Sequence, residues 1–208
     1  MRAQRIVNRY GWRTPFVVLV VALQCWVHLR ERFTLLYLKC CTKGHKGRRV
    51  HWGRDLWVTP GGFLSVGDDV FIGDRCAFEI GLEPAGRIVI GANSWISRDC
   101  HLQGAGRIQI GQNVLIGEFV SIRDTTHGYQ DPDLPIKQQP DVSSSVVIED
   151  GVWIGRGCLI QGKPPGTVIG RGAIIGANAV VTGSIPPMEV CGGVPARLLK
   201  NRICPPMV

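Results

Sequence analysis

Residues 110–122 read IGQNVLIGEFVSI and place an isoleucine at every sixth position. The same spacing, with one large apolar residue every six positions, occurs from residue 66 to residue 181 in five groups of three. The fifteen positions are Val66, Ile72, Phe78, Ile90, Ile96, Leu102, Ile110, Ile116, Ile122, Ile148, Ile154, Ile160, Ile169, Ile175 and Val181. Composition alone does not produce so regular a pattern, and a repeat of this kind is the first indicator of the fold.

A unit of six residues holds one short strand and one bend. The apolar residue points into a narrow interior, and a glycine usually follows it, where the missing Cβ lowers the steric cost of turning the corner. Four residues after the apolar position comes a small residue, as at Cys76, Cys100 and Cys158, which predicts a second inward slot. The sequence therefore predicts an all-β fold, a parallel β-helix of stacked coils. The eight cysteines form no CxxC pair, and we interpret them as reduced thiols of a cytoplasmic protein.

Charge is divided unevenly along the 208 residues. Residues 1–54 hold 12 Lys or Arg and one acidic residue, and the remainder holds 12 and 15, so the leader carries +11 and the body −3 of the total of +8. The basic character therefore belongs to an N-terminal arm, and the body has no general affinity for a phosphate backbone; we expect no nucleic-acid partner. An apolar content of 45% and a charged content of 19% exclude a disordered chain.

The leader, residues 1–49, contains the apolar stretch PFVVLVVALQCWVHL at residues 15–29. It is shorter than the roughly 20 residues that span a bilayer as a helix, and no small-x-small cleavage site follows it. We expect a helical leader that either contacts an anionic membrane surface or caps the open strands of the β-helix; both interpretations stay open. The predicted location is cytoplasmic, and the first of these two interpretations adds peripheral contact with the inner membrane. The predicted division is leader 1–49, β-helix 50–185 and tail 186–208.

The segments IGDRCAFEIG (72–81), IGQNVLIGEFVSI, VWIGRGCLI (152–160) and VIGRGAIIGANAVVTGSIPP (168–187) resemble the hexapeptide-repeat acyltransferases. The resemblance covers about residues 60 to 200. It implies a left-handed parallel β-helix of triangular section with three hexads per coil. It also implies a homotrimer with its active site in the groove between two prisms.

The repeat is interrupted by residues 123–147, RDTTHGYQDPDLPIKQQPDVSSSVV. Long loops in compact domains are usually functional. The pattern H-x-Y-x-D-P-x-x-P-I resembles the sugar and polysaccharide O-acetyltransferases of the family. This resemblance implies that His127 is the general base, with Tyr129 and Asp131 binding substrate. Either Asp124 or Glu118 is a candidate to hold the other ring nitrogen of the imidazole.

The same resemblance implies acetyl-CoA as the acyl donor, bound along the C-terminal coils. Trp153 would flank the cleft between acceptor and donor. Gly155, Gly176 and Ala177 would line the pantetheine track, and Arg197 and Lys200 would lie near the adenosine phosphates. Three further residues, Asp99, His101 and Lys163, receive no assigned role.

The function predicted from the sequence is acetyl transfer from acetyl-CoA to a sugar hydroxyl, in surface polysaccharide or lipopolysaccharide biosynthesis. Two alternatives stay open: an N-acyltransferase acting on an amino sugar, and a non-catalytic β-helix scaffold. A γ-class carbonic anhydrase needs three histidine ligands for zinc, and only His101 and His127 lie within the repeat, so no metal is expected. The sequence fixes neither the acceptor nor the acyl chain length.

Overall fold

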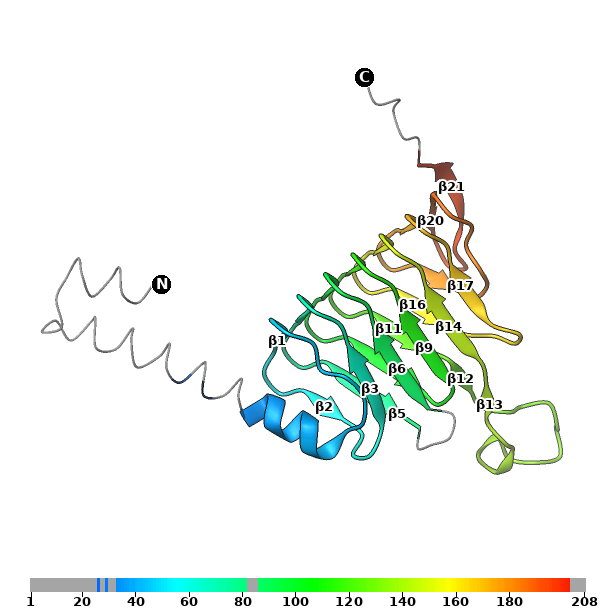
Figure 1. Cartoon of the computed structure of the whole chain (residues 1–208). Helices are drawn as coiled ribbons and strands as arrows, with labels where there is room; N and C mark the ends of the chain where they lie inside the picture. Colours follow the sequence, from blue (N-terminus) through cyan, green and yellow to red (C-terminus); the bar gives the residue numbers. More distant parts are fainter. Residues whose placement is uncertain (1–25, 27–28, 30–32, 82–85, 203–208) are drawn as a thin grey trace, which may run out of the picture. The chain divides into compact units, whose positions relative to one another are not determined.

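The computed structural model describes residues 26, 29, 33–81 and 86–202. The chain forms two compact units, residues 1–40 and residues 41–208. Trp26 and Leu29 of the first unit are helical, and residues 33–41 form a helix whose last residue, Cys41, is the first of the second unit (Figure 1). Within the residues described, no helix is both long and apolar enough to cross a membrane.

The second unit is a parallel β-solenoid whose coils stack along one axis (Figure 1). Each complete coil gives one strand to each of three sheets, which we call A, B and C. Sheet A contains β3 (Phe63–Val66), β6 (Arg87–Ile90), β9 (Arg107–Ile110), β14 (Ser145–Ile148) and β17 (Thr167–Ile169). Sheet B contains β1 (His51–Trp52), β4 (Phe71–Ile72), β7 (Trp95–Ile96), β10 (Leu115–Ile116), β15 (Trp153–Ile154), β18 (Ile174–Ile175), β20 (Glu189–Gly192) and β21 (Arg197–Asn201). Sheet C contains β2 (Trp57–Val58), β5 (Ala77–Ile80), β8 (His101–Gly104), β11 (Ser121–Arg123), β16 (Leu159–Gln161) and β19 (Val180–Val181).

The core confirms the six-residue pattern position by position. All fifteen apolar residues of the repeat are at most 1% exposed. The strands stack in parallel register, so that Ile122 lies between Leu102 and Ile160 of the neighbouring coils. Because side chains alternate across a strand, a two-residue strand points one residue inward and a four-residue strand points two, as Ile108 and Ile110 do in β9. The small slots predicted four positions later are buried as well, and the Sγ of Cys158 donates to the carbonyl of Gly176 at 3.0 Å.

Two different backbone requirements shape each corner. The glycine after the apolar residue is needed because the next coil is close: a Cβ at Gly117 would lie 2.7 Å from the amide nitrogen of Arg156. The left-handed conformation falls two residues further on, at Asn113 (φ 55°) and Phe119 (φ 60°), for example. Asn tolerates this region better than a bulky residue does, so Phe119 is an unusual occupant of its turn.

The ends of the solenoid extend past the limits set by the repeat. Lys43 and Lys46, inside the predicted leader 1–49, already pair in parallel with Phe63 and Val66. At the other end the predicted tail 186–208 supplies β20 and β21, and β21 pairs antiparallel with β20. An antiparallel strand added to the last coil gives the edge of sheet B hydrogen-bonding partners.

Candidate active site

Asp124 is the second residue of the interruption, and its side chain is fully buried. Its two carboxylate oxygens accept hydrogen bonds from the amides of Ala105 and Gly106, each at 2.9 Å, and one oxygen also accepts from the hydroxyl of Thr125. Burial raises the pKa of this carboxyl group, although these hydrogen bonds act in the opposite direction. The backbone carbonyl of Asp124 accepts from the amide of Ser144 at 2.8 Å. Asp124 therefore ties both ends of the loop to the preceding coil.

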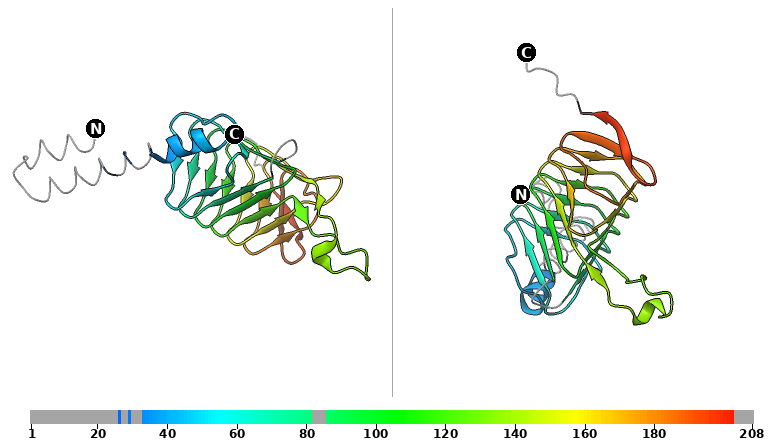
Figure 2. Two further views of the ribbon diagram at one scale, coloured as in Figure 1. Left: turned by 90° about the horizontal axis from the view of Figure 1, so that it is seen from below. Right: turned by 90° about the vertical axis from the view of Figure 1, so that its right-hand side faces the viewer.

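Beyond this anchor the loop starts as a two-stranded ribbon. Strand β12 (Thr125–Thr126) pairs antiparallel with β13 (Val142–Ser143), with Thr126 opposite Val142. One step along this register places His127 opposite Asp141. The rest of the loop, which includes the short 3-10 helix η1 (Ile136–Gln138), stands away from the body of the solenoid (Figure 2).

The imidazole of His127 and the carboxylate of Asp141 form a direct pair. Nδ1 of His127 lies 2.6 Å from Oδ1 of Asp141. An ionised carboxylate only accepts hydrogen bonds, so in the neutral ring this contact places the proton on Nδ1 and leaves Nε2 with its lone pair. The sequence candidates for this orienting role, Asp124 and Glu118, do not take it: Asp124 is held in the anchor, and Glu118 faces Arg156 at 3.7 Å.

The pair borders a pocket of about 130 Å³. The remaining lining residues are Gln103, Arg123, Thr125, Thr126 and Gln161. Arg123 of β11 is in register with Gln103 of β8 and with Gln161 of β16, so three successive coils place polar side chains in one column on the outer face of sheet C. The side-chain amide of Gln161 donates to the carbonyl of Thr125 at 3.2 Å, which fastens the ribbon to this column.

This arrangement can carry out proton transfer. A neutral imidazole with an accessible Nε2 can take a proton from a hydroxyl group, and a carboxylate on Nδ1 stabilises the charged ring that results. The guanidinium of Arg123 and the two amides can hydrogen-bond to a substrate rich in hydroxyl groups. Across the described ranges, no group of three or more His, Cys, Asp or Glu side chains could hold a metal ion.

Tyr129 and Asp131 lie further out on the loop and do not line this pocket. The side chain of Tyr129 is 64% exposed. The carboxylate of Asp131 accepts from the amide of Asp133 at 2.9 Å, while the side chain of Gln139 bonds to the backbone of Asp131 on both its amide and its carbonyl. Within one chain, Asp131 therefore has a local role in shaping the loop.

The residues assigned to the donor lie on sheet B and on the corner beside it. Trp153 stands between Leu115 and Ile174 on the outer face and is 49% exposed. The backbone of Gly155 approaches Ala177 of the next coil so closely that a Cβ would lie 2.6 Å from its amide nitrogen. The other three, Gly176, Arg197 and Lys200, lie on the last coil and on exposed β21. None of these six residues lines the His127 pocket within one chain.

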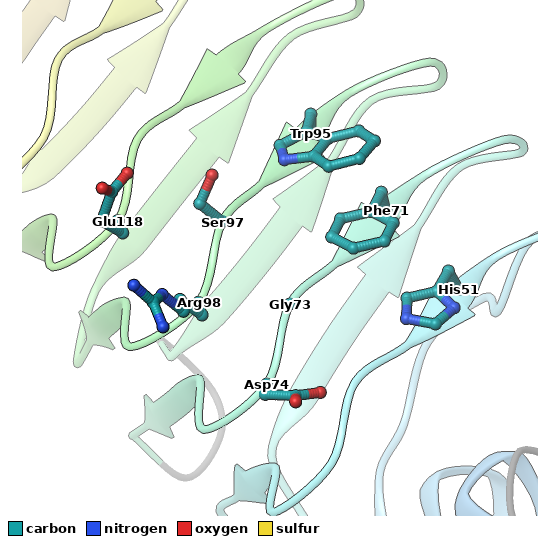
Figure 3. Close-up of a pocket in the computed structure, with 8 residues that line it drawn as sticks. All are labelled: His51, Phe71, Gly73, Asp74, Trp95, Ser97, Arg98 and Glu118. Atoms are coloured by element: carbon teal, nitrogen blue, oxygen red, sulfur yellow. The ribbon is translucent and has the colours of Figure 1, made fainter.

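A second pocket, of about 480 Å³, lies on sheet B near its corner with sheet C (Figure 3). The rings of His51, Phe71 and Trp95 stack along three successive coils, with centroids 4.5 Å and 3.8 Å apart. Arg98 and Glu118 from the corner turns line the same pocket. Since the stacked rings cover one another's faces, the ladder itself stabilises the stacking of the first coils.

Two residues without an assigned role lie against side chains of the preceding coil. Asp99 accepts two hydrogen bonds from the guanidinium of Arg75, both at 2.7 Å, and this pair joins neighbouring coils. Nε2 of His101 lies 3.2 Å from a carboxylate oxygen of Glu79. Both contacts are explained by the stacking of the coils.

Sequence reasoning missed Asp141, Gln103, Arg123 and Gln161. The sequence does contain an indication of Gln103, Arg123 and Gln161. In sheets A and B a glycine usually follows the inward apolar residue, whereas in sheet C a polar or charged residue follows it. Glu79 begins the same column. Asp141 carries no such signal, because its position depends on the pairing of β12 with β13.

Comparisons with known proteins agree with this architecture. Residues 145–183 match the model of the hexapeptide repeat of succinyl-transferase. The chain is 36% identical over 123 residues to WbbJ of Escherichia coli K12, named as a lipopolysaccharide biosynthesis O-acetyltransferase; the match covers 56% of this chain and 61% of WbbJ. It is 37% identical over 178 residues to the acetyltransferase Rv3034c of Mycobacterium tuberculosis H37Rv, covering 82% of this chain and 55% of that protein. The chain thus spans little more than half the length of these two relatives.

Among solved structures, the hexapeptide-repeat acetyltransferase VCA0836 of Vibrio cholerae is similar at 29% identity and a TM-score of 0.52, covering 74% of each chain. A structure of VCA0836 in complex with acetyl coenzyme A matches 92% of each chain with a TM-score of 0.59, at 20% identity, which shows the fold. The inward hexads, the interrupting loop and these matches together show a hexapeptide-repeat β-solenoid that is similar to acetyltransferases of this architecture.

Proposed function

We propose that this protein transfers an acetyl group from acetyl-CoA to a sugar hydroxyl, with His127 as the general base and Asp141 as its orienting partner. The observation that carries the proposal is the 2.6 Å contact between His127 Nδ1 and Asp141 Oδ1 at the edge of a polar pocket. The name of WbbJ supports an acceptor from surface polysaccharide or lipopolysaccharide biosynthesis.

The reaction needs one base and no covalent intermediate. Nε2 of His127 takes the proton of the acceptor hydroxyl as its oxygen attacks the thioester carbonyl, and Asp141 stabilises the imidazolium. When the tetrahedral intermediate collapses, the C–S bond breaks, and the imidazolium returns the proton to the sulfur of CoA. Products are the acetyl ester and free CoA, and the enzyme is regenerated in its starting form.

The acceptor is proposed to bind over the polar column of sheet C. Gln103, Arg123 and Gln161 offer a cation and two amides within the pocket that contains the base. A set of hydrogen-bonding side chains suits a ligand with several hydroxyl groups, because each buried polar group then finds a partner.

The donor is proposed to bind along sheet B of a neighbouring subunit in a homotrimer. Trp95, Leu115 and Trp153 form an outward row on sheet B, each 45% to 49% exposed, and such a row favours burial against another surface. In that arrangement His127 of one subunit would face the donor track of the next, at Trp153, Gly155, Gly176 and Ala177. Arg197 and Lys200 on the exposed β21 would supply the cations for the phosphates of CoA.

The test uses the full chain, acetyl-CoA with a labelled acetyl group, and a panel of neutral and amino sugars and oligosaccharides, with the product identified by mass spectrometry. His127→Ala should abolish label transfer while leaving the melting temperature within a few degrees, because the ring is 76% exposed. His45→Ala, at another exposed histidine, should keep full activity.

Four other outcomes would contradict parts of this proposal. Unchanged transfer by His127→Ala would exclude it as the base. Labelled amide in place of ester would establish the N-acyltransferase alternative. A chain whose melting temperature does not rise with CoA would be a scaffold. A sedimentation mass of about 23 kDa, the mass of one chain, would exclude the trimer.

A further inference from the structure

The helix that ends the first unit exposes an apolar face. Phe33, Leu36 and Tyr37 are 62%, 57% and 45% exposed. At 3.6 residues per turn these three positions and Cys40 fall within an arc of about 100°. Leu38, outside that arc, is fully buried, so the helix buries one side and presents a second apolar side to the surroundings.

Two further exposed apolar residues with helical backbone precede this face in the sequence. Trp26 and Leu29 are helical, are 59% and 53% exposed, and precede Phe33 by seven and four positions. Spacings of three, four and seven residues place side chains on one face of a helix. We call Trp26, Leu29, Phe33, Leu36 and Tyr37 the apolar stripe. A helix facing water would carry polar residues at these positions.

The amino-acid composition of the apolar stripe and the charge around it in the sequence favour a lipid surface as its binding partner. Three of the five residues in the stripe are aromatic, the type that is favoured where hydrocarbon meets lipid headgroups. The stripe lies within residues 1–54, which carry 12 basic residues and one acidic residue, whereas the remaining residues carry a net charge of −3. Three of the basic residues, Arg48, Arg49 and Arg54, pair with aspartates of the solenoid, and the other nine still outnumber the single acidic residue. Basic residues close to an anionic bilayer are attracted to it, and an acidic protein surface is not a binding face for such a membrane.

We propose that the apolar stripe docks the protein on an anionic lipid bilayer, with the helix lying in the plane of the interface and the aromatic rings at headgroup depth. This mode needs no spanning segment, and it combines apolar burial with electrostatic attraction. It would hold the enzyme at a surface where lipid-linked substrates are found, yet it does not depend on the catalytic proposal.

The experiment is vesicle flotation with the full chain, comparing phosphatidylcholine vesicles with phosphatidylcholine vesicles that contain phosphatidylglycerol. The protein should float with the anionic vesicles and be partly released by high salt, because exposed charges are screened. The triple variant Phe33→Gln, Leu36→Gln, Tyr37→Gln should bind at least about tenfold more weakly. A matched control replaces three exposed apolar residues of the last coil, Val194→Gln, Leu198→Gln and Leu199→Gln, and should bind like the parent.

Folding and self-association are followed in the same samples. Melting temperature and affinity for CoA should be the same in the triple variant and the parent, since the altered side chains are exposed. The proposal is overturned if the parent does not float with anionic vesicles, or if the triple variant floats as well as the parent. It is also overturned if the triple variant changes the sedimentation mass and neither protein binds lipid, because a second copy of the chain would then cover the stripe.

Discussion

Replacing Asp141 with Asn tests the candidate site most directly. The substitution keeps the size of the side chain and removes the charge that faces Nδ1 of His127 at 2.6 Å. In the resting enzyme the loss is small, since the two side chains are 76% and 53% exposed and exposed pairs contribute about 0–1 kcal/mol. If His127 is the base, its ring is an imidazolium in the transition state, and the loss there is larger.

The size of the effect follows from the kind of hydrogen bond that is lost. A hydrogen bond to a charged group contributes about 1.5–3 kcal/mol, and solvent exposure of this pair places it near the lower limit. A loss of about 1.5–2 kcal/mol from the transition state alone corresponds to roughly a 10- to 30-fold fall in kcat. KM for the acceptor should change little, because Asp141 touches the imidazole and acts through it.

The assay is the initial rate of label transfer from acetyl-CoA, measured beside the melting temperature. Asp133→Asn is the matched control: it removes the same charge from the same loop, and Asp133 does not line the His127 pocket. We expect full activity from the control and melting temperatures within a few degrees of the parent for both variants. Equal kcat for Asp141→Asn and Asp133→Asn would refute the orienting role, and so would a large loss of stability in Asp141→Asn.

Three further predictions concern the scaffold, each measured as a free energy of unfolding by chemical denaturation. Asp124→Asn should cost about 1–3 kcal/mol at neutral pH, because the amide of Gly106 loses its acceptor. Burial raises the pKa of Asp124, so the folded protein keeps the proton on this carboxyl group to a higher pH than the unfolded chain does. The contribution of Asp124 to the free energy of unfolding therefore falls as the pH rises from about 4 through the native pKa. Asp124→Asn should not show this fall. Gly117→Ala should cost about 1–3 kcal/mol, since its Cβ would lie 2.7 Å from the next coil, whereas Gly183→Ala, with open space around it, should stay within about 0.5 kcal/mol. Ile122→Ala should cost about 2–5 kcal/mol, and a loss below about 1 kcal/mol would contradict its place in the core.

The sequence by itself determined the solenoid, its inward residues and the place of the loop that interrupts the repeat. The reason is physical: a narrow prism needs an inward apolar residue on every short strand, so burial repeats every six residues and is visible in the chain without any knowledge of distant contacts. The interruption that follows Ile122 is visible for the same reason, and the histidine in it belongs to a recognisable local pattern.

Only the tertiary structure decided how the site is assembled. Asp141 meets His127 because β12 pairs with β13 in a particular register, and a register is set by hydrogen bonds between segments that the repeat does not describe. Gln103, Arg123 and Gln161 form one column only after three coils have stacked. Local periodicity fixes which side chains are buried, whereas the neighbours of an exposed side chain depend on how separate segments are brought together.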